Sequence, residues 1–170
     1  GFLARFGIGK PDYPATLGAS GDADPAMGGV PRGVDVSPLL LSAKPRAPLT
    51  GEVTSRFGWR ENPLAPGAED FHTGLDIAAP AGSVIYAALP GVVGDVGHSE
   101  SYGNYVLVDH ENGLQTFYCH CEETIARAGE HIRQGERVAL VGSTGYATGP
   151  HLHFEIRRDT LSCDPLVQLL

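Results

Sequence analysis

The stretch Gly149-Pro150-His151-Leu152-His153-Phe154-Glu155-Ile156 decides the fold that this sequence predicts. Large apolar and polar residues alternate along it after the proline, and this period of two is typical of a β-strand. Side chains two apart in a strand point to the same face. We therefore expect His151 and His153 to project side by side. Leu152 and Phe154 then face the opposite way, into a core.

A second polar pair lies earlier in the chain, within Phe71-His72-Thr73-Gly74-Leu75-Asp76-Ile77-Ala78-Ala79-Pro80. His72 and Asp76 are four apart, a spacing that places two side chains on one face of either a helix or a strand. Gly74 between them and Pro80 behind them disfavour the helix. In either conformation the two side chains can converge.

Two imidazoles and one carboxylate, from His72, Asp76 and His153, form a candidate metal site. Catalytic zinc sites commonly have three such protein ligands and leave the fourth position to water, whereas structural sites usually have four, often cysteines. The chain has no C-x-x-C pair. Because two nitrogens and one oxygen form a donor set of borderline softness, Zn²⁺ is the expected ion, and manganese or cobalt can substitute for it. His151 and His120 are further candidates, since histidines beside a metal can move protons or stabilise an oxyanion.

The remaining cysteines and histidines are expected to have no chemical role. Cys119 and Cys121 flank His120, so strict alternation places both on the face opposite it, as small core residues. With Cys163 the cysteines number three, which neither establishes nor excludes an oxidising compartment. Three other histidines are expected at surface positions: His98, His110 and His131.

Short apolar runs separated by turn residues predict an all-β antiparallel fold. The 170 residues include 23 glycines and 13 prolines, and few helical runs are visible. Asn112-Gly113 is a strong hairpin signal, because both residues tolerate positive φ. Leu89-Pro90-Gly91 is a second hairpin signal, and 58–70 reads as a loop. The expected strands are 52–57, 83–88, 91–96, 105–110, 115–120, 137–141 and 151–156.

The chain divides into an N-terminal arm, 1–46, and a domain, 47–170. The arm lacks sustained periodicity and reads as a linker or extended segment. The net charge of −8 argues against nucleic acid or an anionic membrane surface as a partner. No apolar run reaches the length of a spanning helix. The chain starts at Gly1 without a leader, so we expect any signal or membrane anchor to lie upstream of it.

Taken together, these motifs resemble those of the lysostaphin-type (LytM-like) zinc endopeptidases, which cut peptide bonds in bacterial cell walls. The resemblance covers roughly 49–170 and leaves the first forty-odd residues unmatched. The motifs that carry it are His72-Thr-Gly-Leu-Asp76, Tyr118-Cys-His120 and Gly142-Ser-Thr-Gly-Tyr-Ala-Thr-Gly-Pro-His151-Leu-His153-Phe-Glu155, together with Arg56-Phe57-Gly58-Trp59-Arg60, Gly103-Asn104-Tyr105-Val106 and Asp164-Pro165-Leu166.

The resemblance implies His72, Asp76 and His153 as zinc ligands, with His120 and His151 as the catalytic histidines. It also implies the antiparallel β-sheet or sandwich core of the lysostaphin-type (duplicated hybrid motif) kind, with a groove between loops. Peptidoglycan peptides would be the substrate, and the protein would act outside the cytoplasm, membrane-tethered or secreted.

Two other functions are compatible with parts of the pattern. A zinc-binding scaffold of the same fold in a cell-envelope complex is one, although such relatives usually lack one or more of the five residues. A phosphohistidine carrier of a sugar-uptake system has a related fold, but Asp76 and the His-x-His pair argue against it.

Overall fold

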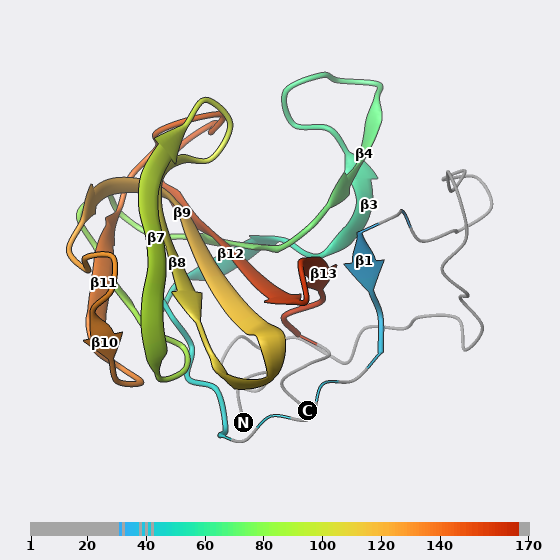
Figure 1. Ribbon diagram of the computed structural model, residues 1–170. Helices are drawn as coiled ribbons and strands as arrows, with labels where there is room; N and C mark the ends of the chain where they lie inside the picture. The colour runs from blue at the N-terminus through green and yellow to red at the C-terminus, as the bar shows by residue number, and fades with distance from the viewer. Residues whose placement is uncertain (1–30, 32, 38, 40, 42, 167–170) are drawn as a thin grey trace.

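The computed structural model describes residues 31, 33–37, 39, 41 and 43–166, and over these residues it is nearly all β (Figure 1). In this described part of the chain no helix has the length and apolar character needed to span a bilayer. Within the described residues the strands are β1 (Val34–Asp35), β2 (Glu52–Ser55), β3 (Gly58–Glu61), β4 (Glu69–His72), β5 (Leu75–Ala78), β6 (Val84–Tyr86), β7 (Gly91–Ser99), β8 (Gly103–Asp109), β9 (Leu114–Thr124), β10 (His131–Ile132), β11 (Arg137–Val141), β12 (His151–Arg158) and β13 (Leu161–Cys163), and the 3-10 turn η2 (Glu111–Gly113) lies between β8 and β9.

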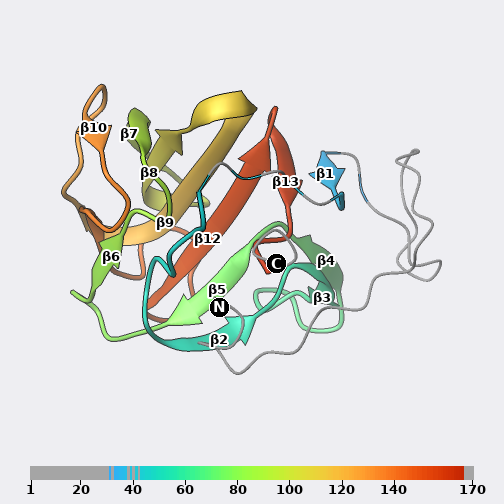
Figure 2. The ribbon, with the colours of Figure 1, turned by 90° about the horizontal axis from the view of Figure 1, so that it is seen from below.

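One large sheet contains most of these strands, in the order β1-β13-β12-β9-β8-β7-β10. Strands β5 and β2 extend it from β12, and β11 and β6 extend it from β9. All its described pairings are antiparallel except that of β1 with β13, so the all-β antiparallel prediction is confirmed. The sheet curls strongly, and the separate β3–β4 hairpin rises across from β7 and β8 (Figures 1 and 2).

Strand β12 has one core face and one polar face, as the alternation predicts. Leu152 and Phe154 are buried in the main apolar cluster, and the ring of Phe154 lies 5.4 Å from that of Tyr118. Burying side chains of this size contributes roughly 1.5–3 kcal/mol each. This packing fixes the strand, so its other face presents His151 and His153 in a defined register.

The Asn112-Gly113 turn forms as predicted. Asn112 has φ 60° and Gly113 has φ 70°, both in the left-handed region that these residue types tolerate. They lie in η2, between β8 and β9, which pair with each other.

Two local predictions are wrong. The turn at Leu89-Pro90-Gly91 does not pair its flanking strands, because β6 pairs with β11 while β7 pairs with β8 and β10. The chain after β6 continues along its neighbour, where the Ala87 amide donates to the Glu136 carbonyl at 2.8 Å. The expected loop 58–70 is instead the β3–β4 hairpin, with Trp59 opposite Phe71 in its register.

Part of the N-terminal arm packs against the domain. Strand β1 adds to the sheet edge in parallel with β13, and Arg158 forms an ion pair with Asp35. Val34 is buried in a small apolar cluster with Phe57, against which Phe71 packs. Residues 1–30 lie outside the described part of the chain. The division of the chain at residue 46 stays a prediction.

Candidate active site

Three of the predicted site residues converge. His72 ends β4, Asp76 lies on β5, and His153 lies on β12 opposite Asp76 in the strand register. Asp76 Oδ1 is 3.0 Å from His72 Nε2 and 2.8 Å from His153 Nδ1. One potential ligand atom from each residue lies within 4.8 Å of the others. The arrangement can hold one metal ion.

A glycine between the first two residues permits this approach. A Cβ at Gly74 would lie 2.6 Å from the Phe154 carbonyl oxygen and 2.9 Å from His153 Cε1. Contacts this short require the backbone or the imidazole to move. Gly74 therefore lets the turn between β4 and β5 lie directly on β12, which brings His72 and Asp76 up to His153.

The two predicted catalytic histidines lie beside this cluster. The rings of His120 and His151 are 4.8 Å apart between centroids, and the ring of His120 is 5.9 Å from that of His153. His151 Nε2 lies 3.8 Å from Asp76 Oδ1. The structure thus brings all five predicted residues into one group.

Each of the four histidines has one ring nitrogen held by a fixed oxygen acceptor, which orients the other nitrogen toward the cluster. The pairs are His72 Nδ1 with the Arg56 carbonyl (2.8 Å), His120 Nδ1 with the Thr144 carbonyl (2.7 Å), His151 Nδ1 with the Gly149 carbonyl (2.8 Å), and His153 Nε2 with Glu155 Oε1 (2.8 Å).

His120 reaches the cluster because β9 is irregular there. Its φ of 61° is left-handed, and the register of β9 shifts against both β8 and β11 at this point. An extra residue of this kind is a β-bulge, which re-aims side chains. Cys119 consequently pairs with His153 and shares its face, while Cys121 joins the main core. The predicted alternation around His120 is therefore wrong, although both cysteines are buried as expected.

The cysteines are poor nucleophiles in this setting. All three are free and buried. Burial, reinforced by Glu155, raises the pKa of Cys119 well above its usual value. Burial raises the pKa of Cys121 to about 12 and that of Cys163 to about 11. Since the thiolate is the reactive form, the cysteine beside His153 is held in its inert state.

Burial and hydrogen bonding set the charges of the site. Burial alone would raise the pKa of Asp76, but hydrogen bonds from His153 and His72 outweigh it and hold the pKa below its ordinary value. Burial lowers the pKa of His120 to about 4, with the neighbouring His151 acting in the same direction. His120 is therefore a neutral imidazole at neutral pH and can accept a proton.

Glu155 is a site residue that the sequence reasoning did not assign. It is fully buried, and its carboxylate accepts hydrogen bonds from His153, from Thr73 Oγ1 (2.8 Å) and from Arg157 Nε (2.6 Å). Burial opposes ionisation, but these hydrogen bonds from His153 and Arg157 bring the pKa of Glu155 to about 2. The period of two that places His151 and His153 together also reaches residue 155, so the signal was present in the sequence.

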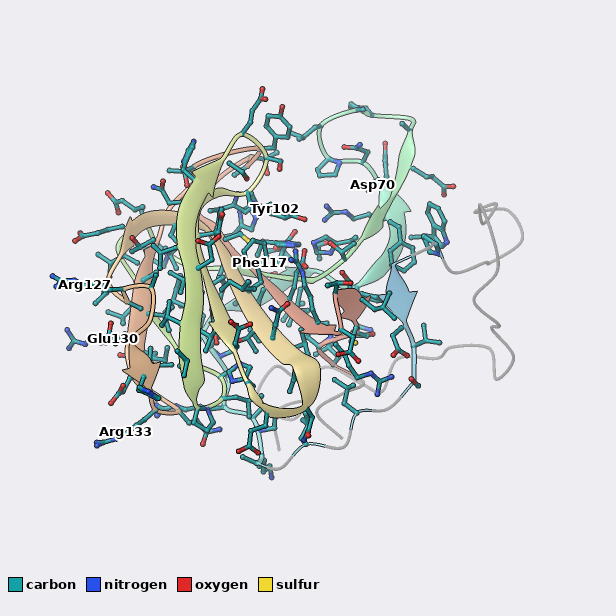
Figure 3. All side chains as sticks on the ribbon, in the orientation of Figure 1. Asp70, Tyr102, Phe117, Arg127, Glu130 and Arg133 are labelled. Atoms are coloured by element: carbon teal, nitrogen blue, oxygen red, sulfur yellow. The ribbon has the colours of Figure 1, made fainter. Side chains whose placement is uncertain are left out.

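The cluster forms the floor of a cleft of about 570 Å³. The β3–β4 hairpin supplies one wall through Arg60, Leu64 and Asp70, and Tyr102 and Tyr146 belong to the other. Figure 3 shows Asp70 and Tyr102 on opposite sides of this opening, with Phe117 below Tyr102. Residues 58–70, expected as a loop, thus contribute to a wall of the cleft.

A larger cavity, of about 1200 Å³, lies apart from the cluster. Its lining includes His110 and His131 but none of the five convergent residues. His110 is more than a surface residue: its ring nitrogens lie 2.6 Å from the Pro90 carbonyl and 2.8 Å from Thr116 Oγ1. We assign the chemistry to the smaller cleft, because among the residues that the structure describes, potential metal ligands and proton-transfer groups meet only there.

The fold and the site define an all-β domain with a candidate His–Asp–His metal centre at the floor of a cleft. The model of peptidase family M23 matches residues 70–165. The chain belongs to this family. That result confirms the predicted resemblance to lysostaphin-type peptidases.

Individual relatives agree with this membership. The "DD-carboxypeptidase/endopeptidase Mpg" of Neisseria meningitidis serogroup B is 36% identical over 134 residues, which cover 79% of this chain and 29% of the relative. The crystal structure of a zinc-containing peptidase from Vibrio cholerae matches with TM-score 0.63 and 33% identity over 69% of this chain and 36% of that one. The catalytic domain of lysostaphin from Staphylococcus simulans matches with TM-score 0.59 and 27% identity over 66% and 89%. The chain thus spans less than a third of the Neisseria relative.

Proposed function

We propose that this chain is the catalytic domain of a zinc-dependent endopeptidase that hydrolyses peptide bonds of peptidoglycan. The observation that carries the proposal is that five side chains converge at the floor of one cleft: His72, Asp76, His153, His120 and His151. A relative from Vibrio cholerae, 39% identical over 111 residues that cover 65% of this chain and 26% of the relative, carries the name "Peptidoglycan DD-endopeptidase ShyC", which supports the substrate class.

The donor set fits zinc. Two imidazole nitrogens and one carboxylate oxygen, from His72, His153 and Asp76, are borderline-soft ligands, and three of them leave a position open for catalysis. The matching Vibrio crystal structure is described as that of a zinc-containing peptidase. When bound, zinc lowers the pKa of a coordinated water and polarises a carbonyl group.

The remaining histidines supply the proton chemistry. His120 presents a neutral Nε2, since its Nδ1 is held by the Thr144 carbonyl. We assign it to accept the proton of the attacking water and to pass that proton to the leaving amine. His151, anchored on the Gly149 carbonyl, faces the same space and is assigned to stabilise the negative charge that develops on the scissile carbonyl oxygen.

The proposed substrate places the protein outside the cytoplasm, where peptidoglycan lies. The net charge of −8 disfavours binding to nucleic acid, so the proposal includes no nucleic-acid partner.

Digestion of purified peptidoglycan tests the function. The zinc-loaded chain should release new peptide termini, read by mass spectrometry, from glycine-bridged or directly crosslinked walls. His151→Ala, purified in the same way, should release none. If the zinc-loaded chain leaves every wall type intact, the proposed activity is wrong and a scaffold role becomes the better account.

A further inference from the structure

Arg60 lies in the lining of the cleft, in contact with Asp76, one of the three candidate metal ligands. Its Nη1 donates to Asp76 Oδ2 at 3.2 Å and to Ser55 Oγ at 2.7 Å, and its Nε donates to Asp70 Oδ1 at 3.3 Å. The Asp76 oxygen that it contacts is the one facing away from His72 and His153, which approach Oδ1. The Asp76 carboxylate thus lies between the guanidinium and the two histidines of the candidate metal site.

The hairpin that carries Arg60 holds it rigidly. Arg60 and Asp70 are register partners on β3 and β4. The neighbouring pair, Trp59 and Phe71, packs edge-to-face with ring centroids 5.3 Å apart, and Phe71 packs on Phe57 at 5.1 Å. A side chain held by two strands and three hydrogen bonds loses little conformational entropy on binding a ligand.

The guanidinium retains N–H donors that could bind a ligand. Its side chain is 24% exposed, and Nη2 donates to no residue in the described part of the chain. Among the described residues that line the cleft, Arg60 is the only lysine or arginine. Asp70 and Asp76 offset its charge, but a bound divalent cation would leave the cleft floor net positive. This floor favours an anionic group in the substrate.

We propose that Arg60 determines specificity by binding a free carboxylate on the leaving-group residue of the substrate. This inference rests on the proposed peptidase function. In a peptide ending in D-alanyl-D-alanine, the scissile carbonyl carbon, the amide nitrogen, Cα and the carboxylate carbon are consecutive atoms. A scissile carbonyl at the metal position therefore brings that carboxylate close to Arg60. Guanidinium groups bind carboxylates with directional, charge-assisted hydrogen bonds.

The same carboxylate occurs wherever the leaving amine sits on a carbon that also bears a free acid. It is absent when the leaving residue continues the chain as an amide. The favoured substrates are then peptides whose leaving residue bears a free carboxylate, either a terminal D-alanine or a crosslink residue of the same stereochemistry.

The test compares two N-acylated peptides ending in D-alanyl-D-alanine, one as the free acid and one as the carboxamide. Binding of each is measured calorimetrically to the zinc-loaded His151→Ala chain, with and without Arg60→Gln. Hydrolysis of each is measured in the zinc-loaded chain without the His151 substitution. Arg127→Gln, an exposed position far from the cleft (Figure 3), serves as the matched control.

We expect the acid to bind about tenfold or more tightly than the amide, as a charge-assisted hydrogen bond would give. Arg60→Gln should abolish that preference while changing amide binding little, and Arg127→Gln should retain it. Equal affinities in the starting chain, a preference that survives Arg60→Gln, or equal weakening of both peptides would each overturn the proposal. If the acid is preferred through Arg60 but the zinc-loaded chain hydrolyses neither peptide and leaves every wall type intact, the proposed peptidase function fails while the carboxylate site stands.

Discussion

Replacing Glu155 with glutamine should weaken metal binding without touching a ligand atom. Glu155 Oε1 accepts from His153 and Thr73, and Oε2 accepts from Arg157. A glutamine oxygen can still accept from His153. Its amide nitrogen, however, then faces the Arg157 N–H, donor against donor. The side chain has 0% exposure, so no bulk water compensates.

The size of the effect follows from those contacts. Losing one buried hydrogen bond to a charged group costs about 1.5–3 kcal/mol. We therefore expect the metal-free Glu155→Gln protein to unfold with a free energy lower by about 2 kcal/mol. Carboxylates that orient a ligating histidine contribute roughly 10–100-fold to metal affinity, and we expect a loss in that range.

The assay uses competition with a chromophoric zinc chelator for affinity, and chemical denaturation with excess chelator for stability. Glu111→Gln, at an exposed position in η2, is the control and should match the starting chain in both. If Glu155→Gln binds zinc with unchanged affinity, then Glu155 does not orient His153, and the account of this contact is wrong.

Three further predictions address other parts of the molecule. His151→Ala should keep zinc, measured by metal analysis, yet lose peptide hydrolysis; an emptied site would contradict the ligand assignment. Gly74→Ala should lower the thermal midpoint and the zinc affinity, because the new Cβ would lie 2.6 Å from the Phe154 carbonyl, and overpacking of this kind typically costs about 1–3 kcal/mol. Burial lowers the pKa of His110 despite its bond to the Pro90 carbonyl, so the unfolded chain binds more protons and stability should fall as the pH drops below about 6.5. In His110→Gln that decrease, measured by denaturation between about pH 7.5 and 5.5, should be smaller, and an unchanged decrease would refute the assignment.

Local periodicity predicted the parts of the fold and site that depend on neighbouring residues in sequence. The alternation from His151 to Ile156 placed Leu152 and Phe154 in the core, where they are buried. The Asn112-Gly113 pair predicted a turn whose positive φ values the structure shows. These features follow from side-chain direction and backbone sterics, which act within a few residues.

Several features that depend on distant partners were not predicted. The bulge at His120 interrupts the period of two and moves Cys119 onto the site face, and nothing in the residues beside it signals the interruption. The turn at Pro90 does not close a hairpin, since β6 takes β11 as its partner. Arg60 reaches Asp76 only because β3 and β4 pair. Strand pairing of this kind is decided by tertiary packing.

The central claim is that hydrolysis depends on one zinc ion held by His72, Asp76 and His153. Stepwise addition of zinc to the metal-free protein, with peptidoglycan peptide release measured at each step, tests it most directly. The account predicts that release rises with bound zinc, reaches its plateau at about one equivalent per chain, and is absent in Asp76→Ala. Release that persists in excess chelator, or an Asp76→Ala chain that binds zinc with full affinity, would contradict it.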